Sequence, residues 1–168
     1  EQPRAAPLAV GDQQRQLRIA LEADLVLQLE QPEHLLVVDE AIAALCAEAI
    51  GCFKVLNEAT LTYSKQRKQF GQPIGNFQVL QHRMVDMFMA NEQSVSMTYM
   101  VTLKLGESDR QRKLAASGAK VQIGKAGKLI SQDAVQIHGG MGMTDELNVG
   151  HFFKRVTMIE SQFGNTDW

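Results

Sequence analysis

A proline-free segment from Glu33 to about Lys68 sets narrow limits on the fold of this 168-residue chain. Alanine, leucine and valine recur in it three and four residues apart, which is the period of an amphipathic helix. The segment begins directly after Pro32 and leads into the helix-breaking sequence FGQP, so it predicts one uninterrupted helix. Such a helix is about 50 Å long at 1.5 Å per residue. That length favours a helical bundle over a small mixed domain.

The same period continues further along the chain and predicts helices over residues 76–105, 109–137 and about 145–160. The helix predicted over 109–137 contains Gly118, Gly124 and Gly127, each of which costs roughly 1 kcal/mol relative to alanine in a helix. We interpret these glycines as points of close contact between helices. The sequence therefore predicts an all-α fold, an antiparallel up-and-down four-helix bundle over residues 33–168.

The first 32 residues have a different pattern. Residues 1–16 are polar, and we interpret them as a leader. Over residues 17–29, apolar residues alternate with mostly polar neighbours, which is typical of a half-buried strand. Because a single strand of that length is unusual, a hairpin that turns near residues 22–24 is favoured, with a helix as the alternative. Residues 1–32 are therefore predicted to be a leader followed by a short β remnant.

Charge and composition exclude several classes of function. The formal net charge is -2, which provides no electrostatic footprint for nucleic acid or for an anionic membrane. No apolar run approaches the ~20 residues of a membrane span, and the start of the sequence lacks the pattern of a signal peptide. Cys46 and Cys52 are too few for a disulfide framework or a zinc site and suit two buried thiols in a reducing compartment. We therefore expect a cytoplasmic protein without a metal site.

Two motifs have the chemistry of anion binding. Arg67 falls in the last turn of the first predicted helix, where it can cap the helix or fork onto a phosphate; spacing alone leaves both roles open. The glycine-rich turn HGGMGMT lies between two predicted helices, so it is not a Rossmann fingerprint, but it can present backbone N–H groups to an anion. His138 in this turn is either a base or ligand, or a solvated capping residue. The eight methionines can line an adaptable pocket, although we interpret most of them as core filler.

The segments RKQFGQPIGNFQVLQHRMVDM and SQDAVQIHGGMGMTDE together resemble the C-terminal helical domain of the acyl-CoA dehydrogenase family, and the similarity spans about Val38 to Thr166. In that family the domain is a four-helix bundle that packs on a middle β domain and an N-terminal helical domain. The resemblance implies that residues 17–29 are the end of a truncated β domain. It also implies FAD as the cofactor, an acyl-CoA thioester as the substrate, and a homo- or hetero-oligomer in which FAD is held across a subunit interface.

The resemblance further implies roles for individual residues. The positions that match the family's FAD contacts are Arg67, Phe70 and Gln78, toward the dinucleotide of a neighbouring subunit, and Gln136, Gly139, Gly140 and Thr166, of which the first three approach the adenosine part. The positions that match substrate contacts are Asp39, Arg155 and Phe163.

The catalytic base of the family is absent from its usual position. The reaction needs a carboxylate that removes the α-proton while hydride leaves the β-carbon for the flavin. Gly164 occupies the position of this glutamate in most members, and Ala41 occupies the position that other members use. Glu40 is adjacent to Ala41, but one helical step rotates a side chain by about 100°. Glu160 precedes Gly164 by four residues and would need the loop to fold back.

Three hypotheses follow from these matches and departures. The chain is part of an FAD-dependent acyl-CoA dehydrogenase whose base is Glu40, Glu160 or a residue outside this sequence. Alternatively, it is a subunit of a heteromeric dehydrogenase that completes a neighbour's FAD site but contributes no base. We favour the second, because the ending HFFKR…FGNTDW resembles the small subunits of two-gene dehydrogenases that act on pimeloyl-type thioesters. The third hypothesis is a helical interaction module without a flavin.

Overall fold

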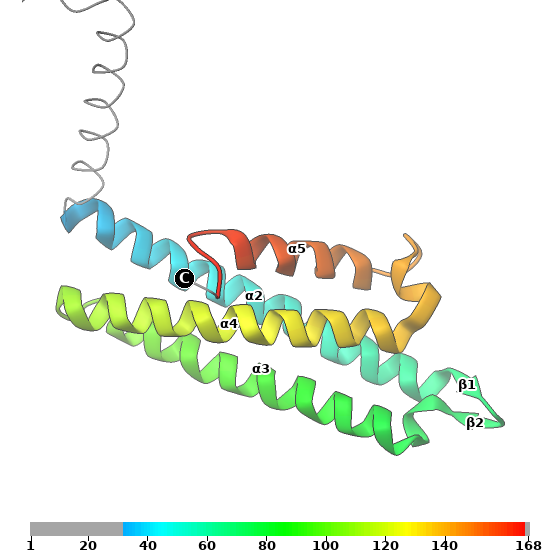
Figure 1. The fold of residues 1–168 in the computed structure, drawn as a ribbon. Helices are drawn as coiled ribbons and strands as arrows, with labels where there is room; N and C mark the ends of the chain where they lie inside the picture. Colours follow the sequence, from blue (N-terminus) through cyan, green and yellow to red (C-terminus); the bar gives the residue numbers. More distant parts are fainter. Residues whose placement is uncertain (1–31, 167–168) are drawn as a thin grey trace, which may run out of the picture. The chain divides into compact units, whose positions relative to one another are not determined.

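Four long helices dominate the computed structural model, which describes residues 32–166, with side chains from Leu36 onward. They are α2 (Pro32–Gln66), α3 (Gln78–Lys104), α4 (Asp109–His138) and α5 (Val149–Ser161). From Val38 onward they belong to one compact unit, and successive helices run in opposite directions (Figure 1). The predicted all-α, up-and-down four-helix bundle is confirmed. The predicted leader and β remnant fall on residues 1–31, outside the described residues.

The first three predicted helices agree with the structure to within two residues at each end. Pro32 opens α2, as expected for a residue whose missing N–H is not needed in the first turn. The last helix differs, because α5 begins at Val149 and not near Asp145. The glycine-rich turn forms the 3-10 helix η2 (Gly139–Met143), and residues between η2 and α5 form turns that delay the start of α5.

A small antiparallel hairpin joins α2 to α3 and was not predicted. Its strands are β1 (Lys68–Gln69) and β2 (Gln72–Pro73), and the 3-10 helix η1 (Ile74–Asn76) follows them. Phe70 and Gly71 form the two-residue loop with φ angles of 52° and 81°. Two positive φ angles in succession characterise the tight turns that fit a twisted hairpin. Phe70 adopts this unfavourable conformation and is 92% exposed.

The core lies along α4, whose inward face is built mainly from small residues. Its buried apolar members are Ala115, Ala116, Ala119, Ile123, Ala126, Ile130, Ala134 and Ile137. A Cβ atom at Gly127 would lie 2.8 Å from Val156 of α5 and 3.5 Å from the Phe53 ring of α2, and one at Gly124 would collide with the Thr166 methyl group. The interpretation as a point of close contact between helices is therefore confirmed for Gly127, whereas Gly124 is approached most closely by Thr166, which lies in a turn after α5. A Cβ atom at Gly118 would make only an ordinary van der Waals contact of 3.5 Å with Met97.

The sulfur-containing residues divide into two groups. Cys46 and Cys52 are free and buried, as predicted, and burial raises the pKa of the Cys46 thiol to about 11. Met87 is buried, and Met84 and Met97 pack partly buried against the core, but the other five of the eight methionines are exposed, so their interpretation as core filler is wrong for most of them. The exposed ones are Met89, Met100, Met141, Met143 and Met158. They lie on outward surfaces of the bundle. Spacing by three or four residues does not distinguish an outward helix face from an inward one.

None of the helices in residues 32–166 is long and apolar enough to cross a membrane.

We predict opposite effects for alanine at two helical glycines. Gly127→Ala should lower the free energy of unfolding by about 1–3 kcal/mol, because the added methyl group overpacks the contact with Val156 and Phe53. Gly51→Ala, on an exposed part of α2 with nothing within 4 Å, should raise it by about 0.5–1 kcal/mol through helix propensity. Urea unfolding followed by circular dichroism measures both. Equal stabilisation by the two substitutions would contradict the close contact at Gly127.

Candidate functional site

A pocket of about 660 Å³ lies where α2 and α4 end and α3 begins. It brings together four of the residues predicted to bind the dinucleotide, namely Arg67, Gln136, Gly139 and Gly140. All four are exposed to solvent. They come from segments about 70 residues apart in the sequence, so their convergence is a property of the fold.

Arg67 lies one residue beyond the end of α2 and has a well-defined backbone. Its N–H donates a hydrogen bond to the carbonyl oxygen of Tyr63, and its own carbonyl oxygen accepts one from the Ile74 N–H, both 2.8 Å long. The first bond continues the helical pattern of α2, and the second closes the hairpin. Both backbone groups are therefore engaged, while the exposed guanidinium can interact with a ligand.

Gly139 and Gly140 present backbone to the pocket in place of side chains. Gly139 ends α4 with a φ of 60° and a ψ of -138°, a conformation that favours glycine. The next turn folds tightly back, since a Cβ atom at Gly142 would lie 2.9 Å from the carbonyl oxygen of Val135. The turn HGGMG thus leaves an accessible strip of backbone beside the end of α4.

Arg83 adds a second guanidinium to the pocket and was not predicted as a site residue. It lies on α3, where it forms an ion pair of 3.1 Å with Asp133 of α4. None of the lining residues carries a carboxylate. Because Asp133 balances the charge of Arg83, the positive charge of this cationic pocket comes from Arg67, and it favours an anionic ligand. Arg83 is part of the motif that carries the resemblance, but nothing in the spacing distinguished it from a solvated surface arginine.

Phe70 and Gln78 do not line this pocket. Phe70 occupies the tip of the hairpin, and its ring packs edge-on against Phe77 with the ring centroids 6.1 Å apart. Gln78 is the first residue of α3 and is exposed. Their assignment to a neighbouring subunit's dinucleotide stays a prediction.

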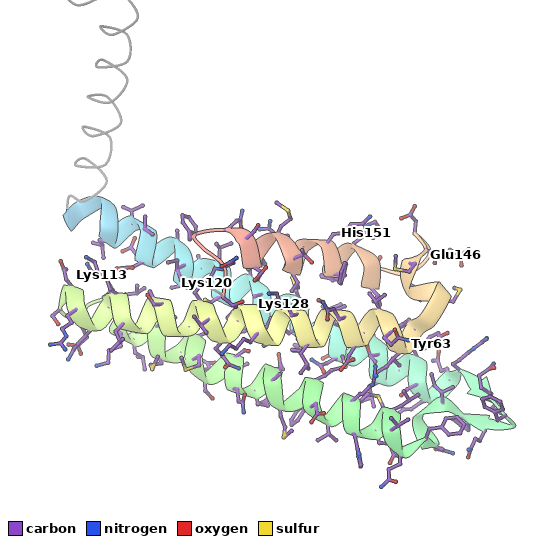
Figure 2. All side chains as sticks on the ribbon, viewed as in Figure 1. Tyr63, Lys113, Lys120, Lys128, Glu146 and His151 are labelled. Carbon is purple, nitrogen blue, oxygen red and sulfur yellow. The ribbon has the colours of Figure 1, made fainter. Side chains whose placement is uncertain are left out.

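The C-terminal segment, residues 162–166, folds against the middle of α4. Lys120 holds it there, because its buried ammonium donates hydrogen bonds of 2.8 Å to the carbonyl oxygens of Glu160 and Gly164. Burial lowers the pKa of Lys120. Phe163 and Gly164 have φ angles of 55° and 95°, which turn the chain back toward α4. Lys120 is labelled in Figure 2. Lys120 was not predicted, since a lysine in a helix ordinarily signals a solvated face.

Thr166, a predicted cofactor residue, packs its methyl group at Gly124, and its hydroxyl donates a hydrogen bond of 3.4 Å to the Glu160 carboxylate. Gly124 precedes Gly139 by fifteen residues, which corresponds to roughly 22 Å along α4. Thr166 and Phe163 therefore lie well away from the cationic pocket of the same chain.

The two candidate bases in this chain have different surroundings. Glu160 forms an ion pair with Lys128, with 3.2 Å between Oε1 and Nζ. Burial tends to raise the pKa of Glu160, but the contacts with Lys128 and Thr166 outweigh burial and lower it. A base poised for proton abstraction needs the opposite shift, toward the working pH. Glu40 is exposed on α2, while the neighbouring Ile42 is buried.

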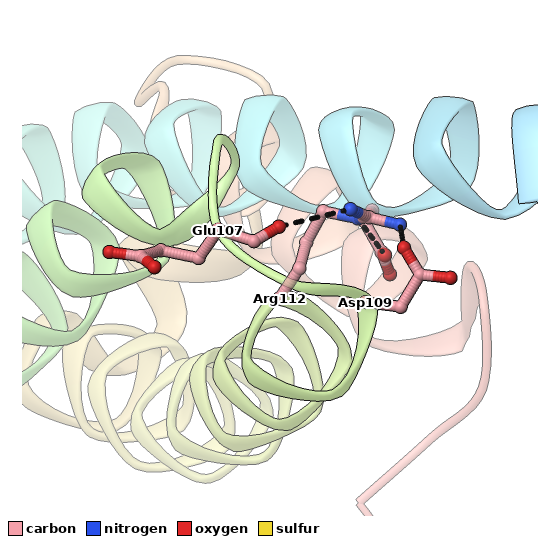
Figure 3. Close-up of polar contacts among 4 residues, drawn as sticks. Glu107, Asp109 and Arg112 are labelled. Atoms are coloured by element: carbon pink, nitrogen blue, oxygen red, sulfur yellow. Dashed lines mark hydrogen bonds and ion pairs between the residues drawn. The ribbon is translucent and has the colours of Figure 1, made fainter.

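Asp39, a predicted substrate residue, is buried in an ion pair with Arg112 of α4, with 2.9 Å between Oδ2 and Nε. Arg112 also contacts the Asp109 carboxylate at 2.8 Å and the Glu107 carbonyl oxygen at 3.5 Å (Figure 3). The hydrogen bonds that Arg112 donates to Asp39 and Asp109 raise the pKa of Arg112. The Asp39 carboxylate therefore joins α2 to the start of α4, and its role toward substrate stays a prediction.

Arg155, the other charged residue predicted to bind substrate, forms a two-pronged contact with Glu48 of α2. The two N–O distances are 2.6 and 2.7 Å. The hydrogen bond from Arg155 is the main cause of a lowered pKa for Glu48. This pair ties α5 to α2 at a half-exposed position.

The Glu48–Arg155 contact predicts a pH-dependent stability. A carboxylate with a lowered folded-state pKa stabilises the fold above its unfolded-state pKa, and this contribution disappears as the pH falls through the folded-state value. We expect Glu48→Gln to lower Tm at pH 7, and the difference from the unchanged protein to vanish in the acid range. Glu58→Gln, at an exposed position on the same helix, is the control. Melting curves between pH 7 and pH 3 test this prediction. A Tm difference between Glu48→Gln and the unchanged protein that does not vary with pH would contradict it.

Comparison with known proteins places these features in a family. The family described as "Acyl-CoA dehydrogenase, C-terminal domain" matches residues 39–167. Acyl-CoA dehydrogenase IpdE2 of Mycolicibacterium smegmatis is 35% identical over 119 residues, which are 70% of this chain and 36% of that protein. The chain thus spans about a third of the length of this curated relative.

Two solved structures have the same fold. A variant of the Tcur3481–Tcur3483 steroid ACAD matches with a TM-score of 0.76 at 25% identity, over 81% of this chain and 38% of that chain. PigA in complex with FAD and proline matches with a TM-score of 0.69 at 30% identity, over 76% of this chain and 33% of that chain. With a family match over residues 39–167 and a four-helix bundle in common, the chain belongs to the acyl-CoA dehydrogenase family, as its C-terminal domain.

Proposed function

We propose that this chain is the FAD-cradling helical part of a heteromeric acyl-CoA dehydrogenase, in which another subunit provides the catalytic base. The observation that carries the proposal is the convergence of Arg67, Gln136 and the Gly139–Gly140 backbone in one cationic pocket. Because the chain spans about a third of its curated relative, the remaining parts of the flavin and substrate sites belong to other domains or subunits.

The donor set of the pocket fits the pyrophosphate and adenosine end of FAD. The guanidinium of Arg67 can fork onto phosphate oxygens, and Arg83, whose charge is balanced by Asp133, adds further N–H donors beside it. The Gly139–Gly140 backbone allows close approach of a ligand, and the Gln136 amide can both donate and accept hydrogen bonds. PigA, a relative in fold, is known in complex with FAD. When bound, FAD supplies the hydride acceptor for α,β-dehydrogenation of an acyl-CoA thioester.

The surroundings of the carboxylates support a base from elsewhere. Gly164 has no side chain, and Glu160 is engaged by Lys128 with a lowered pKa. Such a glutamate stays ionised but is a weak base at neutral pH. The Tcur3481–Tcur3483 steroid ACAD carries two protein names, and we infer a two-chain assembly for the present chain as well. The free, buried thiols of Cys46 and Cys52 suit a reducing compartment such as the cytoplasm.

The first test is the flavin content of the assembly purified from its source organism. Arg67→Ala should raise the Kd for FAD roughly tenfold to a hundredfold, because it removes charge-assisted hydrogen bonds to phosphate. Lys65→Ala, at the end of the same helix but outside the pocket, is the matched control. Absorbance of bound flavin per protein measures the effect. Unchanged flavin content in Arg67→Ala would refute the assignment of this pocket.

The second test concerns the base. Glu40→Gln and Glu160→Gln should each leave acyl-CoA turnover of the assembly within about a factor of two, whereas loss of a general base costs roughly 10²–10⁴-fold. Lys128→Met is the control for Glu160→Gln, since it removes the same ion pair but leaves the carboxylate. A hundredfold loss in either glutamine variant, without a matching loss in Lys128→Met, would identify a base in this chain.

A further inference from the structure

Tyr63 and His138 form a stacked aromatic pair beside the cationic pocket. Their ring centroids lie 4.4 Å apart with an interplanar angle of 29°. Tyr63 belongs to the last turn of α2 and His138 is the last residue of α4, so the pair connects the ends of two helices (Figure 2 labels Tyr63). His138 is only 4% exposed, and both residues contribute to the pocket lining.

Each ring is connected through the backbone to one wall of the pocket. The carbonyl oxygen of Tyr63 accepts the hydrogen bond from the Arg67 N–H. His138 directly precedes Gly139, and its Nδ1 lies 2.8 Å from the carbonyl oxygen of Ala134. A carbonyl oxygen only accepts, so Nδ1 carries the hydrogen and anchors the imidazole to α4. The two stacked rings are therefore attached to the backbone segments that carry Arg67 and Gly139.

We propose that Tyr63 and His138 are positioning residues, whose stacking sets the distance between the Arg67 guanidinium and the Gly139–Gly140 backbone. The inference rests on the proposed function of the pocket. Stacking needs two flat rings, and the tyrosine hydroxyl has no part in it. Phenylalanine should therefore replace Tyr63 without loss, whereas leucine, which is apolar but smaller and has no flat face, should not.

Two measurements test the proposal, and only one of them depends on flavin. In the full chain without ligand, the amide resonances of Gly139 and Gly140 should shift in Tyr63→Leu and stay unchanged in Tyr63→Phe. In the assembly, Tyr63→Leu should raise the Kd for FAD about tenfold, because a misplaced Arg67 or glycine backbone loses most of its interaction with the ligand. Tyr63→Phe should leave this Kd unchanged. Phe53→Leu, a change in the fully buried middle of α2, controls for general loss of packing and should leave both readouts unchanged.

The outcomes separate this inference from the proposed function. If Gly139 and Gly140 resonate identically in Tyr63→Leu and in the unchanged chain, the positioning role is overturned, whatever the flavin content. If the resonances shift but neither Arg67→Ala nor Tyr63→Leu changes the Kd for FAD, the positioning role stands and the dinucleotide assignment fails. Equal effects of Phe53→Leu and Tyr63→Leu on the two glycine amides would also overturn the positioning role.

Discussion

Close packing against α4 is the constraint on which the rest of the structure depends. Gly124 and Gly127 have no side chain where Thr166 and Val156 approach, so α5 and the C-terminal segment can lie directly on the helix. The buried alanines of α4 keep its inward face narrow in the same way. An interior packed at this density tolerates little added volume. The position of α5 therefore depends on the absence of single side-chain atoms on α4. On α4 the small residues lie among three buried isoleucines, and other helices contribute large core side chains such as Phe53 and Leu56.

Polar contacts then fix the other elements at different heights along α4. Arg112 holds Asp39 of α2 near the start of the helix, Lys120 holds the C-terminal segment near its middle, and Asp133 pairs with Arg83 of α3 toward its end. About 40 Å of helix separates Arg112 from Gly139. The C-terminal segment contacts Gly124, about 22 Å along α4 from Gly139, so this segment and the cationic pocket occupy separate parts of the chain.

Much of the fold could be predicted from local periodicity. The limits of α4 and the close contact at Gly127 follow from apolar and small residues spaced three and four apart. The hairpin of β1 and β2 could not be found in this way, because strands of two residues have no measurable period and Phe70 is an unusual residue at positive φ. The start of α5 was placed too early because residues 144–148 form bends and turns and the helix begins only after Asn148. The convergence of Arg67 with Gly139 was anticipated through the family resemblance and not through spacing.

The sequence by itself determined the number and direction of the helices, the burial of both cysteines and the motifs that identify the family. Only the tertiary structure decided which charged residues meet. Asp39 and Arg112 are 73 residues apart in the chain, and Glu48 and Arg155 are 107 apart. A local pattern reports on neighbours within one or two helical turns, so it cannot distinguish a lysine such as Lys120, which holds two carbonyl oxygens, from a lysine in solvent. The pairing of distant side chains depends on how the helices pack, and that packing is set by the small residues of α4.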